Sequence, residues 1–292
     1  MNKLRKLLLG TAFAFAASSS TLAAEPAPLA LKVYNADGNS FHVNSVLVSG
    51  KQDAILIDAQ FSRADAHKLA AEVLASGKQL QAIYVSQGDP DYYFGLDVLQ
   101  QEFPAVKIYA SAPTIAAINA SIDKKFAFWG PKMGANAPHK KVIPEPLPAT
   151  GLSLEGQKLE VIGLDGEQPN RSFVWIPAIK AVVGGVNVFA GLHLWTADTQ
   201  SKAQRAAWLK TLAGIEALHP ATVVPGHSRS ADLGGLEAVR YSADYLRRFE
   251  TELDKKPSAA ALIAAMQRLY PDAGLGIALD IGAKVNTGEM KW

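Results

Sequence analysis

Acidic side chains and a histidine directly follow short apolar segments at three places in this chain. Asp58 ends the first segment, and His227 follows Pro-Gly after the third. Between them, the stretch Ser-Gln-Gly-Asp-Pro-Asp follows the second segment and contributes Asp89 and Asp91. α/β proteins place functional side chains where strands end, because those ends meet at one edge of the sheet. Carboxylates and an imidazole gathered there can hold a divalent cation or transfer a proton, so the spacing predicts one such site.

Alternating strands and helices are expected to position these residues. Apolar and β-branched runs predict strands over residues 29–34, 41–48, 54–58, 80–85, 106–110, 152–163, 172–183 and 222–224. Helical spacing of apolar residues predicts helices over 64–76, 112–122, 201–218 and 236–253. A stretch rich in Gly and Pro over 128–148 is expected to be a surface loop near the site. The alternation predicts an α/β fold in one domain with two similar halves.

The first 24 residues have the composition of an export signal. A basic stretch precedes an apolar run that is too short to span a bilayer, and small residues follow up to Ala24. An uncleaved membrane anchor is the alternative for this segment. We expect a cleaved signal peptide over 1–24, a mature domain over 25–292 and a periplasmic location.

Composition and charge exclude several classes of function. The chain has 292 residues, 49% of them hydrophobic, which is enough to bury a substantial core. It has no cysteine, so it can form neither a disulfide nor a thiolate metal site. Loss of the basic signal segment lowers the formal charge from +2 to −1, and no basic face for nucleic acid is visible. We expect a small-molecule partner and no membrane contact after signal cleavage, whereas the oligomeric state is left open.

The register of these residues resembles the metallo-β-lactamase superfamily. Residues 85–96 occupy the place of the family signature His-x-His-x-Asp-His, which follows a strand and continues into Gly-Leu. The strand that ends in Asp58 and the final Pro-Gly before His227 match the first and last family motifs. The resemblance covers about residues 40–230 and implies a four-layer αββα sandwich with a metal site at one sheet edge. It also implies a hydrolase activity.

Three histidines of the family signature are replaced in this chain. Gln87 and Asp89 stand where the first two histidines are expected, Asp91 is retained, and Tyr92 replaces the last one. The resulting Asp-x-Asp-Tyr pattern resembles a periplasmic, Vmh-type branch of the superfamily. An alternative is structural, because Asp89 and Pro90 can also cap a helix that begins near Tyr92.

The later family motifs are altered as well. Glu167 falls at the third-motif histidine, Val186 falls at the bridging aspartate, and only His227 is unchanged. The resemblance therefore implies one divalent ion (zinc, iron or manganese) held by an oxygen-rich set, and complete loss of the metal is the alternative. The expected ligands are Asp89, Asp91, His227 and Glu167. Without a metal, one carboxyl would have a raised pKa, or a cation such as Arg171 would neutralise it.

Two functions follow from this altered signature. The first is a hydrolase in which a metal-bound water attacks an ester, lactone, amide or related acyl bond. Asp91 would orient or deprotonate the water, and Tyr92 or His193 would stabilise the developing oxyanion. Asp58 and Gln87 are expected not to bind the metal but to orient the residues that do, Asp58 by holding the backbone of the next loop. The second function is a catalytically silent binding protein that has kept the fold and lost the metal.

Overall fold

A six-stranded mixed sheet forms the first half of the fold. The computed structural model describes residues 27–292, so the expected signal peptide lies outside the described residues. The strand order is β1-β2-β3-β4-β5-β6, antiparallel from β1 to β3 and parallel from β3 to β6. The strands are β1 (Ala30–Asn35), β2 (Asn44–Ser49), β3 (Asp53–Ile57), β4 (Gln79–Val85), β5 (Lys107–Ala110) and β6 (Glu145–Pro146).

A second, five-stranded sheet has the order β12-β10-β9-β8-β7. Its strands are β7 (Leu152–Leu154), β8 (Gln157–Ile162), β9 (Phe173–Ile176), β10 (Ala181–Val183) and β12 (Thr222–Val223). Two further short strands, β11 (Phe189–Ala190) and β13 (His227–Ser228), pair with each other in parallel. This last pair brings the end of the predicted Pro-Gly-His motif beside a segment almost forty residues earlier in the chain.

The two sheets pack face to face through alternating apolar side chains. In β3, Ile55 and Ile57 belong to the core between the sheets, whereas Leu56 faces the outer helical layer. In β9, Val174 lies in the same inter-sheet core, and Trp175 points away from it. Successive side chains of a strand point to opposite faces, so apolar runs of this kind form strands that are buried on both sides.

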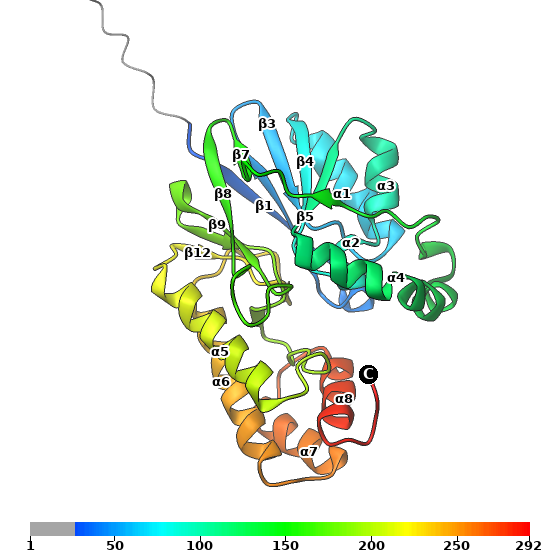
Figure 1. The fold of residues 1–292 in the computed structure, drawn as a ribbon, viewed down its shortest axis with the longest axis vertical. Coiled ribbons are helices and arrows are strands. Elements are labelled where there is room, and N and C mark those ends of the chain that lie inside the picture. Colours follow the sequence, from blue (N-terminus) through cyan, green and yellow to red (C-terminus); the bar gives the residue numbers. More distant parts are fainter. Residues whose placement is uncertain (1–26) are drawn as a thin grey trace, which may run out of the picture.

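Helices cover the outer faces of both sheets (Figure 1). On the side of the first sheet lie α1 (Arg63–Ala75), the short α2 (Pro90–Tyr93), α3 (Leu96–Glu102) and α4 (Ala112–Met133). On the side of the second sheet, α5 (Lys202–Ala217) packs along α6 (Leu236–Leu253). Near the C-terminus, α7 (Ala259–Leu269) packs on α6 and on α8 (Gly276–Asn286). Short 3-10 turns occur at Gly38–Ser40, Gly134–Asn136 and Pro177–Ile179. The predicted αββα sandwich is therefore confirmed.

Several predicted boundaries are wrong, and the longest error concerns the loop expected over residues 128–148. Helix α4 continues to Met133 and contains Pro131 in its last turn. It continues because Phe126 and Trp129 pack against the buried core, so tertiary contacts outweigh the local signal of Gly and Pro. The strand expected to start at residue 41 begins only at Asn44. None of the helices within 27–292 has the length and apolar character needed to cross a bilayer.

Candidate functional site

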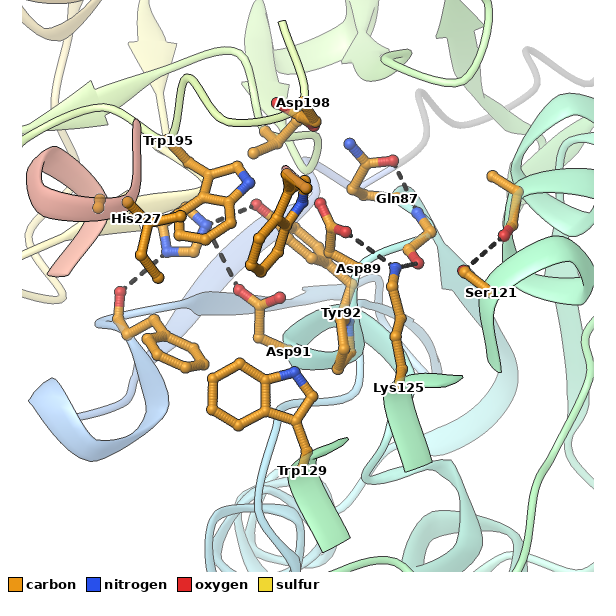
Figure 2. A pocket seen from close by; sticks show the side chains of 18 of the residues that line it. Gln87, Asp89, Asp91, Tyr92, Ser121, Lys125, Trp129, Trp195, Asp198 and His227 are labelled. Atoms are coloured by element: carbon orange, nitrogen blue, oxygen red, sulfur yellow. Dashed lines mark hydrogen bonds and ion pairs between the residues drawn. The ribbon is translucent and has the colours of Figure 1, made fainter. Parts of the chain in front are cut away.

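A cavity of about 570 Å³ lies beside the turn that follows β4 (Figure 2). Helices α4 and α8, the β11 and β13 strands and the C-terminal residue all contribute to its lining. The large apolar side chains around it are Phe41, Phe128, Trp129, Phe189, Trp195, Leu275, Ile277, Ile281 and Trp292. The ionisable ones are Asp89, Asp91, Tyr92, Lys124, Lys125, Asp198 and His227. A mostly apolar cavity with a few converging polar groups is the usual form of a small-molecule site.

Asp58 fixes the position of Ser86, at the start of the turn that follows β4, but does not line the cavity itself. Its two carboxylate oxygens accept hydrogen bonds from the backbone N–H and the hydroxyl of Ser86, at 2.8 and 2.7 Å. The Ser86 hydroxyl also accepts from the backbone N–H of Gly185 at 2.7 Å, so three separate loops meet there. Complete burial raises the pKa of Asp58 to about 7, although both hydrogen bonds oppose this shift.

Asp89 lies at the N-cap of α2, but its side chain does not cap that helix. Its Oδ1 instead accepts from Nζ of Lys125 at 3.0 Å, and the same ammonium donates to the carbonyl of Gly88 at 2.7 Å. The structural alternative of an Asp side-chain cap is therefore wrong. Asp89 is paired with a cation from α4, and both side chains line the cavity (Figure 2).

His227 is held on both of its ring nitrogens. Nδ1 lies 2.9 Å from the carbonyl oxygen of Phe41, which can only accept, so Nδ1 carries the proton. Nε2 is then an acceptor, and the hydroxyl of Tyr92 donates to it at 3.0 Å. The ring stacks on Phe189 at 4.8 Å between centroids. A Cβ on Gly226 would lie 2.8 Å from the Tyr92 hydroxyl, so the glycine of the Pro-Gly-His motif leaves room for this contact.

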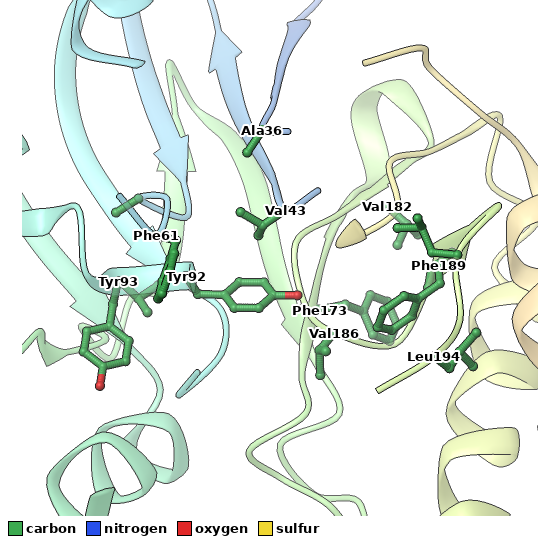
Figure 3. Close-up of a cluster of buried hydrophobic side chains, with 14 of the residues drawn as sticks. Ala36, Val43, Phe61, Tyr92, Tyr93, Phe173, Val182, Val186, Phe189 and Leu194 are labelled. Carbon is green, nitrogen blue, oxygen red and sulfur yellow. The ribbon is translucent and has the colours of Figure 1, made fainter. Parts of the chain in front are cut away.

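Asp91 completes a compact group with Tyr92 and His227. Its Oδ2 lies 3.5 Å from Nε2 of His227, and all three side chains are buried. The pKa of Asp91 is raised well above its usual value, first by burial and then by the charge of Asp89. Burial lowers the pKa of His227 to about 4 and raises that of the Tyr92 hydroxyl. These shifts favour a neutral acid beside a neutral imidazole and a tyrosine that keeps its proton. Tyr92 itself reaches this position from a buried cluster that includes Val43, Val186 and Phe189 (Figure 3).

Arg171 pairs with another acid of the cavity, Asp198, and not with the acids of the altered signature. Its Nη1 lies 3.1 Å from Oδ2 of Asp198, and its Nη2 donates to the carbonyl of Val186 at 3.4 Å. The guanidinium also lies over the ring of Trp208, 4.2 Å from the centroid. Burial raises the pKa of Asp198 to about 6, and the charge of Arg171 opposes that shift.

Three other predicted site residues have different surroundings. Gln87 lines the cavity, and its side-chain oxygen accepts from the backbone N–H of Gly88 at 2.7 Å. Glu167 does not reach the cavity: its side chain is exposed and lies 3.5 Å from Nζ of Lys210. His193 is buried and does not line the cavity, and its Nδ1 lies 3.0 Å from the hydroxyl of Tyr245. The structure thus brings neither Glu167 nor His193 into contact with Asp91 and His227.

Helix α4 and the C-terminal segment contribute cavity residues that the local sequence pattern does not predict. Ser121, Lys125 and Trp129 line the cavity from one face of α4, at the spacing of i, i+4 and i+8. This periodicity is visible in the sequence, but it becomes useful only when the helix is extended beyond residue 122. At the C-terminus, Trp292 packs edge-on against Trp195 with 5.0 Å between centroids, and both line the cavity.

The donor atoms of this site do not fit the metal centre that the family resemblance implies. Among residues 27–292, no three His, Asp or Glu side chains are grouped so that they could hold a metal ion. Asp89 is bound to Lys125, and Glu167 is elsewhere, which leaves Asp91 and His227 from the expected ligand set. A catalytic zinc usually has three protein ligands. Neither a pair of ions nor the predicted four-residue site is matched by these side chains.

Comparison with known proteins bears on the fold and the family. The family model described as "Metallo-beta-lactamase superfamily" matches residues 38–227. Among solved structures, the metallo-β-lactamase DIM-1 exposed to ceftazidime is 17% identical, with a TM-score of 0.51 over 76% of this chain and 98% of that one. A metallo-β-lactamase from Pontibacter korlensis is 18% identical, with a TM-score of 0.51 over 75% and 94% of the two chains. No curated protein sequence matches this chain significantly.

These solved structures support the fold alone, since their sequence identity is low, whereas the family model spans well over half of the chain. The matched range includes Asp58, the turn after β4 and His227. It ends before α6, α7 and α8, so α8, which lines one side of the cavity, lies outside it. The chain belongs to the metallo-β-lactamase superfamily and has the metallo-hydrolase-type fold of that superfamily.

Proposed function

We propose that this protein hydrolyses an acyl bond of a small molecule, with His227, Asp91 and Tyr92 as the acid–base groups. The observation that carries this proposal is the contact of Tyr92 and Asp91 with the same nitrogen of His227, at the cavity. Titratable groups with strongly perturbed pKa values that line a cavity are typical of functional sites. A small polar group bound at this nitrogen would lie within reach of all three side chains.

His227 is the base in this proposal. Its Nδ1 proton is fixed by the carbonyl of Phe41, so the lone pair of Nε2 is the one free to accept a proton. A water at Nε2 transfers a proton to the imidazole while the water oxygen forms a bond to the acyl carbon. The electron pair of the C=O bond moves to the carbonyl oxygen, which becomes an oxyanion. The Tyr92 hydroxyl, freed from Nε2 by the water, donates to this oxyanion.

Asp91 is the acid, because burial favours its protonated form. As the bond from the acyl carbon to the leaving oxygen or nitrogen breaks, the carboxyl proton passes to the leaving group. The proton that His227 has taken from water then returns to Asp91, whose Oδ2 is 3.5 Å from Nε2. One water is consumed, one carboxylic acid and one alcohol or amine are formed, and the pair is restored.

The lining of the cavity favours a substrate with an aromatic or aliphatic body. Trp129 from α4, Ile277 and Ile281 from α8, and Trp292 surround the space beyond the polar groups. Apolar contact of this kind contributes roughly 25 cal/mol per Å² of buried surface. An ester, lactone or amide with a short apolar acyl chain would place its carbonyl at the acid–base group and its chain against these walls.

A binding protein without catalytic activity is the second candidate, and the altered metal donors favour it. Asp89 is neutralised by Lys125, and Val186 stands where the resemblance places a bridging acid. A chain that has lost metal chemistry can keep the cavity as a binding site. Both candidates predict the same type of ligand, so turnover is the property that separates them.

The test is hydrolysis of 4-nitrophenyl acetate, butyrate and octanoate by residues 25–292, with wild type, His227→Ala and His193→Ala side by side. A hydrolase should show saturable turnover that His227→Ala lowers by about 10²–10⁴-fold, the usual contribution of a positioned base. His193→Ala is the matched control, because His193 lies outside the cavity. Saturable quenching of tryptophan fluorescence by an unreactive octanamide, without any turnover of the esters, would support the binding protein instead.

We further propose export to the periplasm by a cleaved signal peptide. The support is the basic stretch, the short apolar run and the small residues up to Ala24. Mass spectrometry of the N-terminus, on protein from a periplasmic extract, tests it. A chain that starts at Glu25 is expected, whereas a chain that retains residues 1–24 in a membrane fraction would refute cleavage.

A further inference from the structure

We propose that Lys125 is a built-in cation that takes the place of a metal ion at Asp89, so that this site works without one. The proposal holds for either candidate function, since it concerns the charge balance of the site and not its turnover. It begins with the ion pair of Lys125 and Asp89 and extends to the other acids of the cavity.

The ammonium of Lys125 is held by two acceptors of the turn after β4. It donates to the carbonyl of Gly88 at 2.7 Å and to Oδ1 of Asp89 at 3.0 Å. The two side chains are only 23% and 30% exposed, and both line the cavity. Asp89 stands at one of the family's histidine positions, where a metal ligand is expected. The ammonium of Lys125 is therefore bound to an oxygen atom, Oδ1 of Asp89, that would otherwise be available to a metal ion.

The packing of α4 on this turn makes the contact possible. A Cβ built on Gly88 would lie 3.0 Å from the Cβ of Ala117, a distance shorter than nearly all real contacts of this kind. Glycine at position 88 therefore lets the helix approach the turn closely. Lys125 lies two turns further along the same helix, and its long side chain reaches back to the carbonyl of Gly88.

Two of the three aspartates that line the cavity have a cationic side chain as partner, which balances their charge without a metal ion. Asp89 has Lys125, and Asp198 has Arg171 at 3.1 Å. Asp91 lies against the neutral imidazole of His227 and carries no cation of its own. The positive charges of Lys125 and Arg171 thus lie within hydrogen-bond distance of Asp89 and Asp198, and they would repel a divalent ion bound beside them.

Metal binding measured directly tests the proposal without any assay of activity. Residues 25–292 are purified without a nickel column, treated with chelator, desalted and titrated with ZnCl₂ and with MnCl₂ by calorimetry, and the melting temperature is recorded with each salt and with chelator. Wild type is expected to bind neither ion in a stoichiometric way and to melt at the same temperature in all three conditions.

Lys125→Met should create the missing affinity. It removes the positive charge and keeps most of the aliphatic chain. Asp89, Asp91 and His227 do not form a metal-holding group in the observed arrangement, and loss of the ion pair frees the Asp89 side chain to turn toward the other two as a third donor. Zinc is expected to bind this variant at least about tenfold more tightly than wild type and to raise its melting temperature. Lys132→Met is the matched control, because Lys132 is an exposed lysine of the same helix that does not line the cavity. Lys125→Arg keeps a cation and should behave as wild type, which separates loss of charge from loss of fold.

Two results would overturn the proposal. One is about one metal per wild-type chain that disappears in His227→Ala, since the site would then hold an ion despite the lysine. The other is a Lys125→Met variant that has native circular dichroism but binds zinc no more tightly than Lys132→Met. In that case the lysine does not decide whether a metal is held.

Discussion

One buried carboxyl, that of Asp58, should contribute a loss of stability as the pH rises from 4 to 7. Its pKa is raised to about 7 in the folded state, against 3.8 for an ordinary aspartate, and burial is the main cause. Between these two values the folded chain binds a proton that the unfolded chain has lost. The contribution of Asp58 to stability is therefore complete below about pH 4 and is lost as the pH rises to about 7.

The size of this effect follows from the shift. At 1.36 kcal/mol per pKa unit, a shift from 3.8 to about 7 corresponds to about 4 kcal/mol in the free energy of unfolding. Asp58→Asn should abolish it, because asparagine has the shape of the protonated acid and can still accept from the backbone N–H of Ser86. At pH 4 the variant should be about as stable as wild type. At pH 8 it should be more stable by up to about 4 kcal/mol, equivalent to a melting temperature on the order of 10 °C higher.

The assay is urea unfolding followed by tryptophan fluorescence at five pH values from 4 to 8. Comparison of Asp58→Asn with wild type cancels the other carboxyls, several of which have lowered pKa values and act in the opposite direction. Asp232→Asn, on an exposed residue, is the control and should parallel wild type. If the profiles of Asp58→Asn and wild type run parallel across this range, Asp58 is ionised in the folded protein and the reasoning from burial is wrong.

Three further predictions concern the cavity. Tyr92→Phe should lower kcat for ester hydrolysis by about 10²-fold with little change in KM, because the hydroxyl is proposed to leave Nε2 of His227 and donate to the oxyanion, and not to the bound substrate; a change confined to KM in steady-state kinetics would argue against that role. The plot of kcat/KM against pH should have its acid limb near pH 4, where His227 gains a proton, and a limb near pH 6.5 would point to another base. Arg171→Ala should destabilise the fold by about 3 kcal/mol in urea, since it leaves Asp198 without its cation and uncovers Trp208; Arg171→Ala combined with Asp198→Ala should recover part of that loss.

Most elements of the sandwich and the neighbourhood of the site could be predicted from the order of residues alone. Strands such as β3 and β4 are buried on both faces, so they appear as short apolar runs whatever surrounds them. Helix α6 was predicted with its observed bounds because its apolar residues recur on one face. Asp58 directly follows β3, Asp91 lies in the short helix α2 that follows the turn after β4, and His227 follows Pro-Gly. The local pattern was therefore enough to place three of the polar groups near one another.

Tertiary structure decided which of the candidate side chains meet. Lys125 and Asp89 are 36 residues apart, and their contact depends on where α4 crosses the turn after β4. His193 points toward Tyr245, and Glu167 points into solvent. These orientations depend on the packing of distant helices and on side-chain rotamers. Helix α8 and Trp292 close the cavity from beyond the part of the chain that resembles the family. Local periodicity specifies strands and helices because it reflects which face is buried, whereas the partners of a charged side chain depend on elements that are brought together only when the whole core packs.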